Sequence, residues 1–186
     1  MISSIRMLVT ALAIVAAVLP GAGSRPAVAA SAAEIDRGVD ATLQALYGEI
    51  PAARTLGGVA AGILVFPNVV KAGFIIGGQY GEGALRLDGR TVGYYSTLAA
   101  SYGLQAGAQS FGYALFFMSD DSLDYLVRSS GWEVGVGPSI VVLDAGAART
   151  LTTTTAKSDI YAFIFSQRGL MAGLGLQGSK ISRIDR

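Results

Sequence analysis

The chain has 186 residues, of which 52% are hydrophobic and 15% are charged, and it contains 25 glycines but neither cysteine nor histidine. A chain of this length and composition is expected to form one compact domain with its own core, which excludes an intrinsically disordered protein. The absence of histidine and cysteine excludes disulfides, thiol nucleophiles, imidazole bases and metal sites with these ligands, so we expect neither a bound metal nor a cofactor.

The first 29 residues have the pattern of a secretory signal peptide. Arg6 precedes an apolar run of thirteen residues, Met7–Leu19, and Ala27-Val28-Ala29 supplies a small-residue cleavage site. The apolar run is shorter than the ~20 residues of a membrane-spanning helix. We therefore expect cleavage after Ala29 and general secretion to the periplasm or the exterior, with residues 30–186 as a single mature domain.

The mature chain has a nearly neutral charge. Removal of residues 1–29 takes away Arg6 and Arg25, which leaves 12 basic and 13 acidic side chains. Nucleic-acid binding depends on clustered positive charge, so we do not expect a nucleic-acid partner.

A helix is expected at the start of the mature chain. Ser31-Ala32-Ala33-Glu34 matches a capping box, in which the serine hydroxyl and the glutamate carboxylate accept hydrogen bonds from the first helical turn. The apolar residues that follow recur at helical spacing: Ile35, Val39, Leu43 and Leu46. This spacing predicts an amphipathic helix over Ala32–Tyr47, and Ala52–Leu56 adds a further turn after Pro51. The charged residues expected on or near its solvent side are Glu34, Asp36, Arg37 and Asp40.

From Gly58 onward the apolar period changes towards two, which is typical of half-buried β-strands. In one such stretch Val70, Ala72, Phe74 and Ile76 alternate with Lys71, Gly73, Ile75 and Gly77. The Asp88-Gly89 pair predicts a tight hairpin, and Gln167-Arg168-Gly169 predicts a second one. We therefore expect neighbouring strands to be antiparallel.

One later helix is predicted at Asp120–Ser129, with Ser119 as its N-cap, and strands are predicted over Trp132–Leu143 and Tyr161–Leu176. Glycine within strands marks bends and close backbone approach. The expected fold class is α+β: an amino-terminal amphipathic helix packed on a Gly-rich, curved, mainly antiparallel β-sheet or barrel, with one further helix near 120–129.

Several motifs suggest chemistry, but their context argues against it. Gly173–Gly178 matches a dinucleotide fingerprint by letter, but only eight residues follow it, too few for the required helix and strand. The Thr152–Thr155 run before Lys157 could supply a hydroxyl and an amine, as in a small hydrolase, yet a threonine run is more typical of a β-rich segment. The isolated acids Glu82, Asp88, Asp144 and Asp159 are typical of turns and surfaces. We therefore expect no enzyme activity.

Seven short motifs follow one another after the first helix. They are Gly62-Ile63-Leu64-Val65-Phe66-Pro67, Val70-Lys71-Ala72-Gly73-Phe74, Gly81-Glu82-Gly83, Thr91-Val92-Gly93-Tyr94-Tyr95, Gly103-Leu104-Gln105-Ala106-Gly107, Trp132-Glu133-Val134-Gly135-Val136 and Gly169-Leu170-Met171-Ala172-Gly173. In this order they resemble the SYLF domain, a family of lipid-binding modules that includes Ysc-type actin-binding domains, over roughly Ala33–Ile184. The resemblance implies a non-catalytic domain. Eukaryotic members bind phosphoinositides and some bind actin, whereas bacterial relatives are mostly exported single-domain proteins.

Two departures from the eukaryotic pattern narrow this expectation. The first helix carries three acids, Glu34, Asp36 and Asp40, where eukaryotic members resemble one another in a Lys-rich helix that meets the membrane. The Leu-Glu-Gly of the family reads Leu176-Gln177-Gly178 here, so a role of that glutamate is not carried over. An exported protein also meets neither actin nor phosphoinositides, which removes both from the expected partners.

We therefore expect an exported, membrane-associated module that binds anionic phospholipid or a membrane surface without catalysis. Lys71 matches a position in the family's Val-x-Lys-Ala-Gly-Phe stretch, and Arg168 precedes the matching Gly-Leu-Met-Ala-Gly. These two are the candidate lipid-binding residues, with ordinary surface cations as the alternative. The competing hypothesis is an envelope protein-interaction or scaffold module that uses exposed sheet edges for strand addition, with a protein partner the sequence does not identify.

Overall fold

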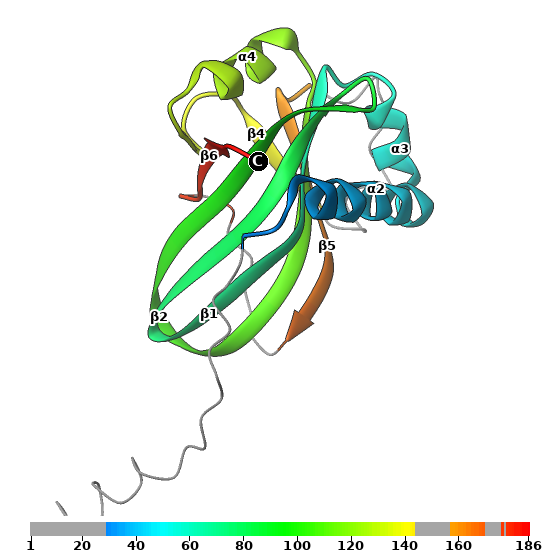
Figure 1. Ribbon diagram of the computed structural model, residues 1–186. Coiled ribbons are helices and arrows are strands. Elements are labelled where there is room, and N and C mark those ends of the chain that lie inside the picture. Colours follow the sequence, from blue (N-terminus) through cyan, green and yellow to red (C-terminus); the bar gives the residue numbers. More distant parts are fainter. Residues whose placement is uncertain (1–28, 144–156, 170–175, 177) are drawn as a thin grey trace, which may run out of the picture.

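The computed structural model describes residues 29–143, 157–169, 176 and 178–186. The expected signal peptide, apart from Ala29, lies outside the described residues. The helices and strands, in chain order, are α2 (Ala32–Glu49), α3 (Pro51–Gly57), β1 (Gly62–Leu87), β2 (Arg90–Phe117), α4 (Asp120–Arg128), β3 (Trp132–Glu133), β4 (Ile140–Leu143), β5 (Ile160–Gly169) and β6 (Lys180–Ile184). The predicted α+β class is confirmed, with α2 and α3 beside a curled sheet and α4 near one end of it (Figure 1).

The capping box at the start of α2 is confirmed. The Ser31 hydroxyl accepts a hydrogen bond from the Glu34 backbone N–H at 3.3 Å, and the Glu34 carboxylate accepts one from the Ser31 backbone N–H at 2.8 Å. The helix runs to Glu49, and Pro51 then occupies the first turn of α3, where its missing N–H costs no helical hydrogen bond. Local chemistry therefore sets both helix starts.

The sheet is built on one long hairpin. Strands β1 and β2 pair antiparallel from Gly62 opposite Phe117 to Leu87 opposite Arg90, and both curve strongly (Figure 1). The strand order is β3-β6-β2-β5-β4, with β1 also paired to β2. The mainly antiparallel sheet is confirmed, but the expectation that all neighbours are antiparallel is wrong for β4 and β5, which are parallel. The long connection between Leu143 and Ile160 permits this, because parallel strands need a crossover of about a dozen residues or more.

The curled sheet has two apolar faces. The inner face carries a core that includes Leu64, Phe66, Tyr95, Tyr113, Leu115, Phe117 and Trp132. The opposite face is covered by α2 and α3, and its core includes Ile35, Val39, Leu56, Ile63, Val65, Ala114, Phe116 and Phe163. Each large apolar side chain buried in this way stabilises the fold by about 1.5–3 kcal/mol. Because both faces are buried at the helix-covered end, the strands there have continuous apolar sequences and no alternation of apolar and polar residues.

Two predicted turns have different outcomes. The Asp88-Gly89 hairpin is confirmed: both residues have positive φ, 49° and 75°, as a type I′ turn requires. The hairpin predicted at Gln167-Arg168-Gly169 is wrong, because β5 continues through these residues and Gly169 pairs with Gln109 of β2. A bulge accounts for the turn-like sequence: Ser166 has a φ of 53°, and the register of β5 shifts there.

The segment after β2 is also partly corrected. Helix α4 is confirmed, and the Ser119 hydroxyl caps it by accepting from the Ser122 N–H at 3.3 Å. The strand predicted over Trp132–Leu143 is reduced to β3 and β4. Gly135 and Gly137 between them have φ values of 100° and 91°, which breaks the extended backbone.

Candidate functional site

Polar side chains gather on the inner face of the sheet, beyond the inner core. The buried members, here called the inner polar cluster, are Lys71, Gln79, Thr97, Gln109 and Ser179. Lys71 and Gln109 are directly paired across β1 and β2, so their side chains share one face. The Gln79 side-chain amide donates to the Ser179 hydroxyl at 2.9 Å, which joins β1 to the segment before β6.

Three buried oxygens in and beside this cluster have no hydrogen-bond partner of good geometry among the described residues: Thr97 Oγ1, Gln109 Oε1 and the Tyr113 hydroxyl. Burial raises the pKa of Tyr113, so its hydroxyl stays protonated and can donate a hydrogen bond at physiological pH. A buried polar group without a partner costs about 1–3 kcal/mol. A water molecule or a polar group of a ligand would therefore be stabilised beside this cluster.

Lys71 is enclosed, contrary to its alternative interpretation as an ordinary surface cation. Its exposed fraction is 8%, whereas the neighbouring Val70 is 48% exposed and Ile76 is 64% exposed. Hydrophobicity alone would bury the two apolar residues and expose the lysine. The register shift between Phe66 and Val69 reverses the alternation, so the odd-numbered residues face inward after it.

Arg168 lies on the other face of the sheet. It is exposed in β5 and pairs with Ser110, whose partner on β1 is Val70. Lys71 lies one position further along: it pairs with Gln109 of β2, which in turn pairs with Gly169 of β5. The structure therefore brings the two predicted cations close in register, but it places them on opposite faces.

Large apolar side chains are exposed on the outer face of the bent hairpin. This set, here called the outer apolar patch, consists of Val70, Ile76, Tyr80 and Leu98. Tyr80 and Leu98 are directly paired. Val70 pairs with Ser110 of β2, and Ser110 pairs on its other side with Arg168 of β5, so Val70 and Arg168 lie in one row across the sheet. A groove of about 560 Å³ adjoins the patch between α2 and β1, and Ile35, Pro67, Val70 and Tyr80 are among its lining residues.

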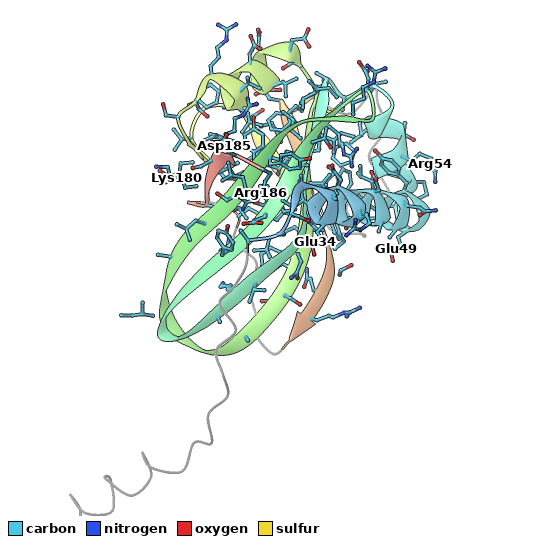
Figure 2. All side chains as sticks on the ribbon, in the orientation of Figure 1. Glu34, Glu49, Arg54, Lys180, Asp185 and Arg186 are labelled. Atoms are coloured by element: carbon cyan, nitrogen blue, oxygen red, sulfur yellow. The ribbon has the colours of Figure 1, made fainter. Side chains whose placement is uncertain are left out.

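Glu82 organises a second polar group at the end of this groove. Its side chain is 9% exposed, and one carboxylate oxygen accepts from Arg186 and from the Tyr80 hydroxyl. The other oxygen accepts from the Ala30 backbone N–H at 3.2 Å. The hydrogen bond to Glu82 raises the pKa of Tyr80. Figure 2 shows Arg186 near the amino-terminal end of α2, so Glu82 connects both ends of the described chain.

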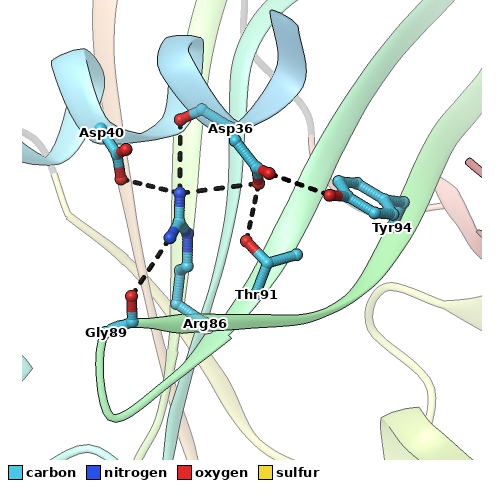
Figure 3. A network of polar contacts seen from close by, with 6 residues as sticks. All are labelled: Asp36, Asp40, Arg86, Gly89, Thr91 and Tyr94. Atoms are coloured by element: carbon cyan, nitrogen blue, oxygen red, sulfur yellow. Dashed lines mark hydrogen bonds and ion pairs between the residues drawn. The ribbon is translucent and has the colours of Figure 1, made fainter. Parts of the chain in front are cut away.

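A third network fastens α2 to the sheet (Figure 3). The Arg86 guanidinium donates to Asp40 at 2.7 Å, to the Asp36 carbonyl at 3.3 Å and to the Gly89 carbonyl at 3.1 Å. The Asp36 carboxylate accepts from Thr91 at 2.6 Å and from Tyr94 at 2.9 Å. Asp36, predicted to lie at the solvent side of the helix, thus reaches the sheet. These contacts fix the helix rather than offer free functional groups.

The acids considered as catalytic groups have structural roles where they are described. Asp159 accepts from the Ser139 N–H at 2.8 Å and from the Ser139 hydroxyl at 2.7 Å, and these bonds lower its pKa. Asp88 forms the hairpin turn. Asp144 and Thr152–Thr155 lie outside the described residues. Gly178 precedes strand β6 and not a helix, which removes the dinucleotide interpretation of the glycine motif.

Within the described parts of the chain, no three acidic side chains come together as possible metal ligands. No helix there is long and apolar enough to cross a membrane.

Sequence reasoning missed the Arg86 and Glu82 networks, although each residue has a signal: a charge inside an otherwise apolar or Gly-rich strand. The inner polar cluster has the same signal at Gln79 and Gln109.

These features define a curled-sheet α+β domain with an enclosed polar cluster on one face of the sheet and an exposed apolar patch on the other. Residues 98–185 match the model of the Ysc84 family, described as Las17-binding protein actin regulator. This match, which runs from within β2 to the residue after β6, is consistent with a member of the SYLF family, a family of binding domains, and it confirms the resemblance seen in the sequence. A search of curated proteins found no match to the chain. Arg168 lies within the matched region, and Lys71 precedes it.

Proposed function

We propose that this chain is an exported module that binds anionic phospholipid at a membrane surface and catalyses no reaction. The observation that carries the proposal is the outer apolar patch, in line with the exposed cation Arg168. Membership of a SYLF family supports lipid binding in general. The headgroup class and the export of the chain are proposals.

The patch and the cation would contribute differently. Apolar area removed from water stabilises association by about 25 cal/mol per Å², and this contribution is insensitive to salt. A basic side chain near an anionic surface contributes about 1 kcal/mol, which salt screens. We expect Arg168 to face the lipid with the patch. Lys71, on the inner face, would contribute less to the first contact and more to holding a polar group inside the curl.

Vesicle co-sedimentation tests the proposal. The mature chain is mixed with vesicles of phosphatidylglycerol and phosphatidylcholine, or of phosphatidylcholine alone, at low and high salt. The variant Arg168→Ala should weaken binding to the anionic vesicles about fivefold at low salt and little at high salt. Its control is Arg128→Ala, because Arg128 is an exposed cation on α4, away from the patch. Lys71→Ala should weaken binding less than Arg168→Ala.

The apolar contribution needs its own variant. Ile76→Ser together with Leu98→Ser should reduce binding at both salt concentrations, whereas Val127→Ser, an exposed apolar residue of α4, should not. A chain that sediments with neither vesicle would contradict lipid binding. That result would instead favour the protein-interaction alternative, in which an exposed strand edge pairs with a partner strand.

Export is tested separately by amino-terminal sequencing of the protein recovered from the periplasm or the medium. The proposal expects Ala30 as the first residue, because Ala27-Val28-Ala29 forms the cleavage site. A mature product that keeps Met1 in the cytoplasm would contradict it.

A further inference from the structure

We propose that cleavage after Ala29 creates an α-ammonium group at Ala30 that binds the Glu82 carboxylate and fixes the new amino terminus in the groove between α2 and β1. This inference rests on the proposed export. It assigns to Glu82 the role of binding the α-ammonium group that signal-peptide cleavage would produce.

The position of Ala30 carries the inference. Its backbone nitrogen lies 3.2 Å from Glu82 Oε2, and Ala30 is half-buried. The next residue, Ser31, is the N-cap of α2 and is held by three hydrogen bonds that involve the side chain of Ser31 or of Glu34. The helix cap therefore fixes Ala30 beside Glu82, so the nitrogen needs no rearrangement to remain there after cleavage.

Processing changes the charge of this nitrogen. Hydrolysis of the Ala29–Ala30 peptide bond by a signal peptidase adds one water molecule, which leaves a carboxylate on Ala29 and an amine on Ala30. An α-amine has an ordinary pKa of about 7.7–8.0, so at neutral pH it takes up a proton. A neutral amide donor would thus become a cation facing a carboxylate. Because the acceptor is already a carboxylate, the gain on cleavage is the attraction between the new positive charge and Glu82.

The surrounding charges favour this pairing. Among the described residues, the charged and titratable groups that face the Ala30 nitrogen or its partner are Glu34 of α2, Tyr80 and Glu82 of β1, and Arg186 after β6. Arg186 and Tyr80 bind Oε1 of Glu82, whereas Ala30 binds Oε2, so the two cations use different oxygens. The Glu34 carboxylate is already bound by Ser31. Glu82 is therefore the acceptor for the new terminus.

The pairing of the Ala30 amine with Glu82 predicts that the stability of the processed chain depends on pH. An opposite charge favours the protonated amine, so the pKa of the Ala30 amine in the folded chain should exceed its unfolded value. The added stability is then present at neutral pH and is lost as the pH rises through the raised pKa.

The first test compares two chains whose termini are generated in vitro from a cleavable fusion, one beginning at Ala30 and one at Val28. The chain beginning at Ala30 should melt roughly 2–4 °C higher at neutral pH. The difference should disappear when both chains carry Glu82→Gln, because the acceptor charge is then absent. Glu34→Gln is the matched control: it removes the other carboxylate of the groove, lowers the melting temperature of both chains and should keep their difference.

The second test needs no variant. The α-amine of the chain beginning at Ala30 is labelled briefly with an acylating reagent over a range of pH and quantified by mass spectrometry, with the urea-unfolded chain as reference. We expect about tenfold slower labelling in the folded chain near pH 7, where both amines are mostly protonated, as a pKa raised by one unit would produce. Equal melting of the two chains, or equal labelling of folded and unfolded amines, would overturn the proposal. Both tests use chains made in vitro, so they are independent of the sequencing result that decides export.

Discussion

Gly83 lies directly against the backbone of Val65, in the part of the sheet where β1 curls back over itself. A Cβ atom at Gly83 would overlap the Val65 carbonyl oxygen and would lie 2.8 Å from Cδ1 of Phe66. A carbonyl inside a strand cannot move aside without breaking the strand pairing. The close contact between the two halves of β1, and with it the enclosure of the inner face, therefore depends on a glycine.

Gly83→Ala should destabilise the domain by about 3 kcal/mol, the upper end of the usual cost of overpacking. Urea denaturation measures the change. Gly78→Ala on the same strand is the control, because its Cβ would meet nothing closer than the Ala99 carbonyl at 3.5 Å, an ordinary contact. If the two variants unfold at the same urea concentration, the close contact of Gly83 with the Val65 backbone is contradicted.

Arg86→Met should lower the free energy of unfolding by roughly 1–3 kcal/mol. This lies between the values for exposed and buried ion pairs, because Arg86 is mostly buried and Asp40 is exposed. Asp36→Asn alone and combined with Arg86→Met completes a double-mutant cycle, in which we expect a coupling of at least about 0.5 kcal/mol. Arg128→Met, which breaks an exposed pair with Asp124, should change stability by less than about 0.5 kcal/mol. Additive effects of the first two changes would contradict the network.

Gly89→Val should cost on the order of 1–3 kcal/mol through backbone strain alone. Gly89 has a φ of 75°, and a Cβ there would touch no other atom within 4 Å. Gly48→Ala in α2 separates backbone strain from side-chain contact, because its Cβ also meets nothing within 4 Å but its backbone is helical. We expect that second change to stabilise the protein by about 0.5–1 kcal/mol. Thermal or urea denaturation that finds both variants equally stable would contradict the turn.

Ser139→Ala should reduce stability at neutral pH by at most about 1 kcal/mol, because Asp159 is largely open to solvent. Hydrogen bonds from Ser139 lower the pKa of Asp159 below its unfolded value. Their contribution is thus present above the unfolded pKa, about 3.9, and is lost as the pH falls through the folded pKa. The difference between the two proteins should shrink in acid. Ser158→Ala is a control, and a difference that does not change between pH 7 and pH 2 would contradict the assignment.

The sequence by itself determined the features that depend on a few neighbouring residues. The Ser31–Glu34 capping box, the Ser119 cap of α4 and the Asp88-Gly89 turn were all predictable, because hydrogen bonds and φ angles within four residues decide them. The α+β class followed from the change of apolar period at Gly58. The family resemblance singled out Lys71 and Arg168 as candidates.

Only the tertiary structure decided how these elements face one another. One register shift after Phe66 turned Lys71 inward and Val70 outward, and the pairing through Ser110 then placed Arg168 on the side opposite Lys71. The direction of β4 against β5, and the contact of Glu82 with Ala30 and Arg186, join segments far apart in the chain. Strand alternation has a period of two, so one extra residue reverses every later side chain, and no local pattern records where that residue is inserted.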